Sequence, residues 1–343
     1  MKNLKEYVTE GFKLGKNYKK PFNYYPTTKD ELKDIVKQLI DERGNDADLN
    51  DIDTSEITDM SYMFYDLNFN GDISRWDVSN VEDMEGMFGI SDFNGDISNW
   101  NVSKVTNMCC MFKCSSFKGD LSKWDVSNVK NMESMFERSK YNGDISKWDV
   151  SNVEDMTGIF ELSKFNGDIS NWDTHNVILM RSTFYASEFD GDISNWNVSN
   201  VKDMSYMFME SKFTGKNGDI SRWDVSHVEN MDGMFKESIY DGDISNWDVS
   251  NVKNMESMFE RSKYNGDISK WDVSNVRDMS HMFAHSIFDG DLSKWDISNV
   301  KDMSYMFMSS KFTGKNGDIS SWESNKHIKR ICMFYDSKFA NLK

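Results

Sequence analysis

The residues with the clearest potential for chemistry are aspartates that recur at a fixed interval. Each follows a glycine, and in neighbouring coils of a repeat their carboxylates would lie ~4.8 Å apart and repel by roughly 1 kcal/mol each. Hydrogen bonds from turn amides would offset this repulsion, and we favour that interpretation. The alternative is a calcium ladder, although calcium-binding solenoids use more Gly and Asp per turn. The column is Asp72, Asp96, Asp120, Asp144, Asp168, Asp192, Asp219, Asp243, Asp267, Asp291 and Asp318, the first six being the metal-ligand candidates.

Catalytic motifs are absent from the sequence. His281 and His285 are four residues apart, but no third ligand accompanies them, and the other histidines form no zinc signature. Cys109, Cys110 and Cys114 occupy positions that vary between repeats, so we interpret them as incidental reduced thiols. The sequence therefore predicts a protein that is not an enzyme.

Charge is unevenly distributed along the chain. The formal net charge is -17, yet residues 1–20 hold six lysines against Glu6 and Glu10. The acidic body argues against nucleic-acid binding, which needs clustered Lys and Arg. With no apolar signal region, no lipobox cysteine and no stretch near ~18 apolar residues, we expect no membrane insertion. A cytoplasmic or virion-associated location is favoured over classical secretion.

An internal period identifies the elements that must position these residues. Eleven tryptophans lie 24 residues apart except for two steps of 27, which arise from insertions that contain Lys216 and Lys315. Ile52 lies 24 residues before the first tryptophan, so about twelve coils are expected. The tryptophans are Trp76, Trp100, Trp124, Trp148, Trp172, Trp196, Trp223, Trp247, Trp271, Trp295 and Trp322.

Each coil combines two apolar rhythms. In Trp76-Asp-Val78 the spacing of two predicts a short parallel strand with one buried face. Met84–Phe88 has the i, i+3, i+4 spacing of one helical or 3-10 turn. Stacked coils would bury the Trp and Met ladders in a continuous core, which we favour over a sugar-binding strip or a soft-metal site. The fold class predicted is a repeat solenoid of the leucine-rich-repeat type.

The ends of such a solenoid need covers. Thr28-Lys-Asp-Glu31 is a capping box, and an apolar stripe follows it, so we expect a helix at about 29–43 over the first coil. The predicted organisation is a basic N-terminal segment at 1–27, capping helix and linker at 28–48, the solenoid at 49–327 and a C-terminal cap at 328–343.

The repeated string Gly-Asp-Ile-Ser-x-Trp-Asp-Val-Ser-Asn-Val-x-x-Met-x-x-Met-Phe resembles the BspA-like leucine-rich-repeat family of bacterial surface proteins, also met as the mycoplasma lipoprotein-type repeat. The resemblance covers residues 49–340. It implies a surface-exposed binding scaffold that adheres to proteins or cells.

The first eleven residues carry a second resemblance. Met1-Lys-Asn-Leu-Lys-Glu-Tyr-Val-Thr-Glu10-Gly11 is similar to the head-targeting peptides of large tailed bacteriophages, in which an aliphatic residue lies two before a cleaved Glu. Val8 and Glu10 fill those places, so cleavage would leave Gly11 first. A phage head-associated or packaged virion protein is therefore an alternative to the scaffold.

Candidate binding positions fall into a uniform and a variable set. Arg75 and Asp77 lie at outward positions that are nearly uniform among the coils. Variation gathers around the predicted helical turn and at the insertions, where a specific protein partner would bind. Self-association is a further expectation, and a glycan-binding adhesin remains an alternative that needs exposed aromatic residues. The variable candidates are Tyr62, Arg181, Tyr206, Lys216 and Lys315.

Overall fold

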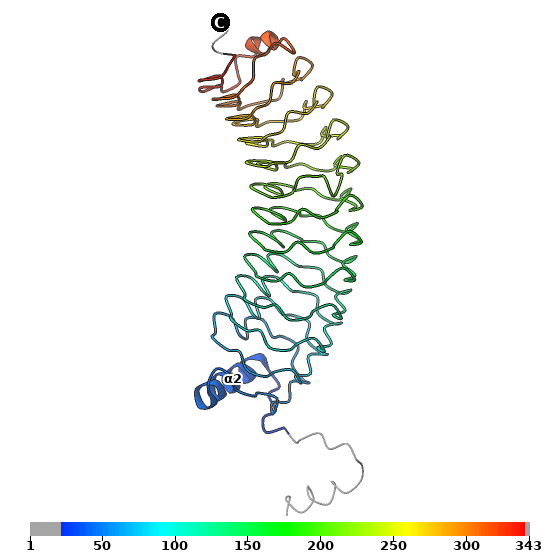
Figure 1. The fold of residues 1–343 in the computed structure, drawn as a ribbon, viewed down its shortest axis with the longest axis vertical. Helices are drawn as coiled ribbons and strands as arrows, with labels where there is room; N and C mark the ends of the chain where they lie inside the picture. The colour runs from blue at the N-terminus through cyan, green and yellow to red at the C-terminus, as the bar shows by residue number, and fades with distance from the viewer. Residues whose placement is uncertain (1–21, 340–343) are drawn as a thin grey trace, which may run out of the picture.

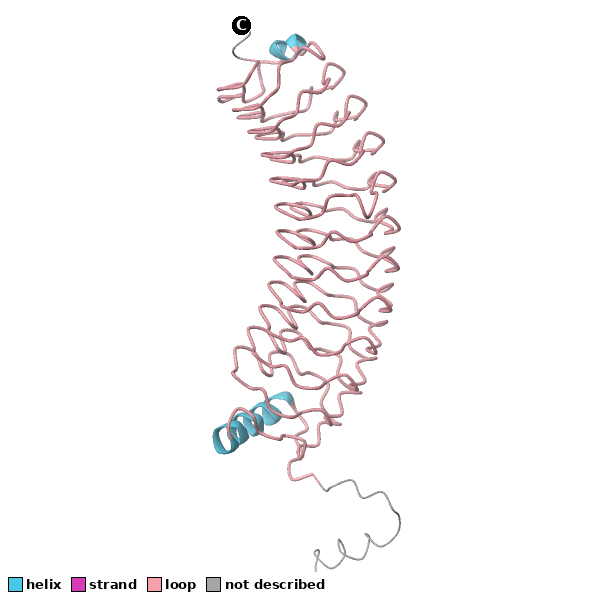
Figure 2. Cartoon of the chain, viewed as in Figure 1, coloured by secondary structure: helices cyan, strands magenta, loops and turns pink. Residues whose placement is uncertain are grey.

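The computed structural model describes residues 22–339, which form an elongated and gently curved stack of coils (Figure 1). Within this range α2 (Lys29–Arg43) lies at the N-terminal end and the 3-10 helix η1 (Ser320–Ser324) at the other. Turns, bends and single-residue bridges make up the rest of the described range (Figure 2). Neither of these two helices is long and apolar enough to cross a membrane. The prediction of a repeat protein is confirmed.

The N-terminal helix begins where the sequence predicts. Thr28 Oγ1 accepts a hydrogen bond from the Glu31 backbone N–H at 3.3 Å, as an N-cap should. The Glu31 carboxylate accepts from the Thr27 N–H at 2.8 Å, one residue earlier than a capping box requires. Gly44, at φ +89°, ends the helix by donating to the Ile40 carbonyl at 2.8 Å. The buried side chains of α2 are Leu32, Val36 and Leu39.

The strand predicted at Trp76–Val78 is wrong. The Trp76 N–H donates to the Ile73 carbonyl at 3.1 Å and the Val81 N–H to the Val78 carbonyl at 3.0 Å, so one tight turn ends at Trp76 and another begins at Val78. Short polar side chains cap these turns, which competes with strand pairing. Parallel bridges occur elsewhere: two join Tyr24 to Ile52 and Asp48 to Asp72, and the others form a column with one residue in each coil. The twelve residues of this column are Asp59, Asp83, Asn107, Asn131, Asp155, Leu179, Asp203, Asn230, Asn254, Asp278, Asp302 and Lys329.

The helical or 3-10 turn predicted at Met84–Phe88 is also wrong. Gly86 and Ile90 have φ values of +57° and +53°, which a right-handed helix excludes. The spacing of three is still used, because the Met87 N–H donates to the Met84 carbonyl at 3.2 Å. A series of tight turns therefore reproduces the apolar spacing of a helix.

In residues 84–90 and their equivalents, which we call the axial segment, every second peptide group forms hydrogen bonds along the axis of the stack. Four N–H groups of one coil donate to carbonyls of the next, and all of them point toward the C-terminal end. The equivalents of Gly86 and Ile90 are left-handed in all twelve coils. In the second coil the donor and acceptor pairs are Met84 and Asn107 (3.0 Å), Gly86 and Cys109 (2.8 Å), Phe88 and Met111 (2.9 Å), and Ile90 and Lys113 (2.7 Å).

The core consists of ladders of like residues, as predicted. Every tryptophan is at most 4% exposed, and Met84 and its equivalent methionines are fully buried. Trp172 Nε1–H donates to the Ile145 carbonyl of the preceding coil at 3.1 Å, and each tryptophan except Trp322 makes the equivalent bond. Continuous aromatic and Met packing therefore replaces a compact globular core.

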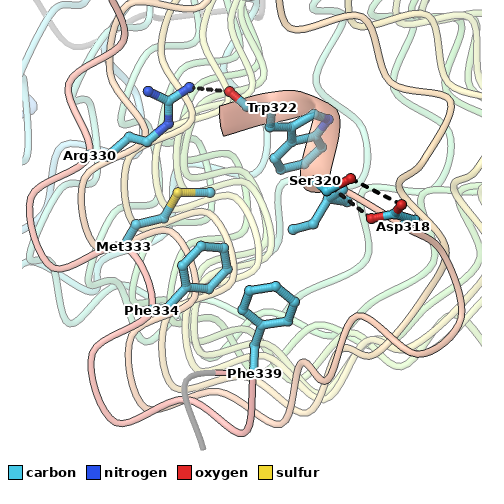
Figure 3. A pocket seen from close by; sticks show the side chains of 8 residues that line it. Asp318, Ser320, Trp322, Arg330, Met333, Phe334 and Phe339 are labelled. Carbon is cyan, nitrogen blue, oxygen red and sulfur yellow. Dashed lines mark hydrogen bonds between the residues drawn. The ribbon is translucent and has the colours of Figure 1, made fainter. Parts of the chain in front are cut away.

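Arg330 occupies the place of the core methionine in the last coil and closes the C-terminal end. Its guanidinium donates to the Trp322 carbonyl at 2.6 Å (Figure 3). It also donates to the Asn325 carbonyl at 2.7 Å. Met333 of the expected cap is buried, whereas Ile331 is 48% exposed. A mainly apolar pocket of about 340 Å³ remains beside Arg330, lined by Trp322, Met333, Phe334 and Phe339.

Replacing Ile90 by Asn should stabilise the protein. A β-branched side chain is strained in left-handed backbone, whereas Asn tolerates that conformation, and Ile90 is already 46% exposed. We expect the free energy of unfolding, measured by urea denaturation, to rise by about 1 kcal/mol. Ile239→Asn is the control, because Ile239 is similarly exposed (39%) outside the left-handed columns. Equal effects of the two substitutions would contradict the strain argument.

Candidate functional site

The aspartates that follow glycine cap turns. Asp144 Oδ1 accepts from the Ser146 N–H at 2.9 Å, and every other member of the column accepts the same bond from the serine two residues later. Hydrogen bonds from the Ser98 hydroxyl and amide lower the pKa of Asp96, although the adjacent carboxylates of the column raise it. Within residues 22–339 no three His, Cys, Asp or Glu side chains are placed to hold a metal ion. Every aspartate of the column therefore caps a turn, as the favoured interpretation predicts.

Arg75 and Asp77 lie on what we call the repeated face, the columns equivalent to these two residues. Asp77 Oδ1 accepts from the Ser79 N–H at 3.0 Å, so this carboxylate also caps a turn. The Arg75 side chain is exposed. In the tryptophan coils the Arg75 column holds Arg, Lys, Asn or Ser, and the Asp77 column holds Asp or Asn in all but the last. The repeated face is therefore polar throughout, and its Asp77 column serves the backbone.

The side chains that differ between coils gather on another face, built by the axial segment. We call it the variable face: the four columns equivalent to Glu85, Gly86, Gly89 and Ile90. The second and fourth of these columns are left-handed. Three candidates from the sequence lie here, since Arg181 is in the Glu85 column and Tyr62 and Tyr206 are in the Gly86 column.

Two of these candidates, Arg181 and Tyr206, form one cluster. The Arg181 guanidinium carbon lies 5.6 Å from the centre of the Tyr206 ring, a cation–π arrangement. The Tyr206 hydroxyl donates a hydrogen bond to the Asp232 carboxylate of the next coil. Burial raises the pKa of Asp232, although the Tyr206 bond acts in the other direction. Tyr62 lies six coils away, so the structure does not bring it into this cluster.

Tyr62 nevertheless repeats the arrangement of Tyr206. Its hydroxyl donates to the Glu85 carboxylate, and its ring covers Gly86, where an added Cβ would lie 2.6 Å from Tyr62 Cε1. At Gly233 the same Cβ would lie 2.5 Å from Tyr206 Cδ1. This motif was not identified from the sequence. Its signal is a Tyr one coil before an acidic residue and Gly.

Several carboxylates of the variable face or next to it are destabilised by their surroundings. The pKa of each is raised, first by burial and then by other carboxylates nearby. Lysines pair with others on this face, as in the 2.6 Å contact of Lys113 with Glu137 and the 2.8 Å contact of Lys236 with Glu260. The four carboxylates with raised pKa are Glu133, Glu161, Asp232 and Glu256.

The remaining candidates lie apart from this face. Lys216 and Lys315 are exposed in the two insertions, each next to a left-handed glycine. Their backbone N–H groups donate to the hydroxyls of Thr214 and Thr313 at 3.2 Å. The proposed cleavage between Glu10 and Gly11 lies outside the described residues, as does the phage-type peptide.

Comparison with known proteins identifies the repeat. Three stretches, residues 32–143, 137–240 and 238–343, match the family described as "Mycoplasma protein of unknown function, DUF285". The chain belongs to this family. No curated protein and no solved structure matches it. The DUF285 chain is therefore a mycoplasma-type tandem-repeat protein.

Gly86→Ala should destabilise the protein more than Gly158→Ala. Both glycines are left-handed, at φ +57° and +59°, so their backbone penalties are matched. Only at Gly86 does the new methyl group meet the Tyr62 ring; at Gly158 the nearest atoms are 3.3 Å away. We expect a difference of about 1–2 kcal/mol in unfolding free energy. It should disappear in a Tyr62→Ala background, and its persistence there would exclude ring contact as the cause.

Glu133→Gln should stabilise the protein at pH 7. Because the folded-state pKa of Glu133 is raised from its ordinary value of 4.5, the ionised carboxylate costs stability above the folded pKa. That cost falls as the pH drops through the folded pKa, so variant and wild type should converge in acid. Glu229→Gln is the control of opposite sign, because the bond from Lys253 lowers the pKa of Glu229. Thermal midpoints from pH 3.5 to 7.5 test both, and a Glu133→Gln effect independent of pH would contradict this account.

Proposed function

We propose that this chain is a non-enzymatic scaffold of the leucine-rich-repeat, BspA-like type that binds a protein partner through its variable face. The stacked coils with parallel bridges support a solenoid of this kind. The resemblance to BspA-like repeats supports an adhesion-type role at a surface.

One observation carries the proposal. The two left-handed columns contain twenty-four positions, and twenty-one of them hold a residue other than glycine. Such backbone costs of order 1 kcal/mol per non-glycine residue, and asparagine, which tolerates it best, occurs at none of the twenty-four. Stability alone would favour Gly or Asn in these columns. Retention of varied side chains there supports selection for contacts outside the chain.

The composition of the variable face suits protein recognition. Tyr and Arg dominate the residues that carry binding energy at protein interfaces. Tyr62 and Tyr65 are 40% and 39% exposed, and their ring centroids lie 5.4 Å apart. The Arg181 and Tyr206 cluster provides a second aromatic site with a cation in reach. Paired and unpaired carboxylates between these sites favour a partner with basic groups.

The glycan-binding alternative has less support. Sugar recognition through an aromatic strip requires outward rings, and every tryptophan is buried with at most 4% exposure. Apart from the pair Tyr62 and Tyr65, the most exposed tyrosines lie far apart, with Tyr25 near one end of the stack and Tyr335 near the other. A protein partner therefore fits the described surface better than a polysaccharide.

Arg181→Ala should weaken binding of the partner while leaving the fold intact. Immobilised wild-type protein would capture binders from extracts of the source cells, and mass spectrometry would identify them. Binding to each variant would then be measured with the purified partner. We expect Arg181→Ala to raise its Kd by about thirtyfold, as loss of a hot-spot side chain does.

Arg75→Ala is the matched control, since it removes an exposed arginine from the repeated face. We expect it to bind as the wild type does, with both variants melting normally by circular dichroism. If only Arg75→Ala lost binding, the repeated face would be the interface and the proposal would be wrong. Capture of a second copy of this chain would identify self-association as the interaction.

A further inference from the structure

We propose that Cys109 and Cys110 form a hydroperoxide-reactive dithiol, a thiol-modification site in the third coil that closes to a disulfide. The Cys109 Sγ–H donates to Cys110 Sγ, and the two sulfurs lie 3.5 Å apart. Both side chains are partly exposed on the variable face, and both are free thiols. This site is independent of the binding function proposed above.

The surroundings distinguish the two sulfurs. The hydrogen bond from Cys109 lowers the pKa of Cys110, burial opposes this effect, and the charge of Lys113 assists it. The same bond raises the pKa of Cys109. Because the thiolate is the nucleophilic form of cysteine, Cys110 is the attacking sulfur and Cys109 the resolving one.

The chemistry balances with one hydroperoxide for each pair of thiols. The Cys110 thiolate attacks the terminal oxygen of the hydroperoxide; the O–O bond breaks, and the leaving alkoxide or hydroxide takes up a proton. Cys110 becomes a sulfenic acid. The Cys109 sulfur then attacks Cys110 sulfur, the S–O bond breaks, and the leaving hydroxide takes the Cys109 proton to form water. Two thiols are oxidised to one disulfide, and the peroxide is reduced to an alcohol or water and one further water.

The backbone makes this disulfide easy to reduce. The peptide group between the two cysteines belongs to the axial ladder: Gly86 N–H donates to the Cys109 carbonyl at 2.8 Å, and Cys110 N–H donates to the Glu133 carbonyl at 2.8 Å. Consecutive Cα atoms lie roughly 3.8 Å apart, closer than the ~5.5 Å usual across a disulfide. The ring would be strained, and strained disulfides are the readily reduced, regulatory kind. Its closure would also pull on the bonds to the second and fourth coils.

Serine variants provide folded controls. Ser61, Ser205 and Ser280 occupy the column of Cys109, and Ser134 and Ser257 occupy that of Cys110. Because the backbone accommodates serine at both places elsewhere in the stack, Cys109→Ser and Cys110→Ser should fold.

The experiment treats the native protein with hydrogen peroxide, alkylates the remaining thiols and digests the chain with trypsin. Cleavage after Lys104 and Lys113 places Cys109 and Cys110 on the peptide 105–113, with Cys114 on 114–118. After peroxide treatment we expect peptide 105–113 to carry no alkyl group and to be lighter by two hydrogens than the unalkylated dithiol peptide. A thiol reductant should restore both thiols, which can then be alkylated. Cys114→Ser should leave this result unchanged.

Single variants test the assigned order. In the Cys109→Ser variant, dimedone should trap a sulfenic acid at Cys110. In the Cys110→Ser variant, Cys109 should still be alkylated after peroxide treatment, to the same extent as Cys332. If both cysteines of peptide 105–113 were still alkylated after peroxide treatment, the proposal would be overturned. So would a disulfide that joins this peptide to 114–118 or to a second molecule.

Discussion

The axial hydrogen bonds of the variable-face segment are the interaction on which the rest of the structure depends. Each coil donates four N–H groups to the next, and two residues of this segment, four positions apart, are left-handed in every coil. The period of 24 residues keeps the axial N–H groups of one coil opposite the carbonyls of the next. Insertions are tolerated where they leave the ladder untouched: Asp203 still pairs with Asn230 across 27 residues, since the three extra residues lie in a distant turn.

This ladder also gives the stack a direction. In residues 84–90 and their equivalents the axial N–H groups point toward the C-terminal end and the axial carbonyls toward the N-terminal end, so these peptide dipoles add along the stack. A smaller number of bonds between coils run the other way, such as that from the Glu82 N–H to the Thr58 carbonyl at 2.8 Å. The polarity is the reverse of that in an α-helix, whose N–H groups face its N-terminus. The N-terminal end of this ladder is therefore its negative end, and there Lys29 Nζ lies 3.2 Å from Asp59 Oδ1. The capping helix thus contributes a cation to that end as well as apolar cover.

The sequence predicted the period, the core ladders and α2 because these depend on burial and capping, which residue types encode. It mispredicted the local backbone at Trp76–Val78 and Met84–Phe88, since successive tight turns give the same apolar spacing as a strand and a helix. The left-handed positions could not be predicted from residue type, because residues such as Tyr62 and Ile90 have positive φ where Gly would be expected. In the candidate site, variation between coils singled out Arg181 and Tyr206, which the structure brings together. The Tyr–Gly contacts and the thiol pair could not be predicted from the sequence, because stacking and side-chain direction decide which residues meet.

Within each coil, the side chains that stabilise the fold differ from those of the variable face in the direction in which they point. Apolar side chains point inward and stack on their equivalents, so changing one disturbs its neighbours in two other coils. The left-handed positions contribute their backbone to the ladder, whichever side chain they carry, and many of these side chains are exposed or partly exposed. The effects of a substitution there reach the adjacent coils at most, as at Gly86, where an added methyl group would meet the Tyr62 ring of the preceding coil. Such an array can diversify one face while its core stays constant, which explains how Cys110, His281 and Tyr305 occupy the same place in coils of nearly identical core.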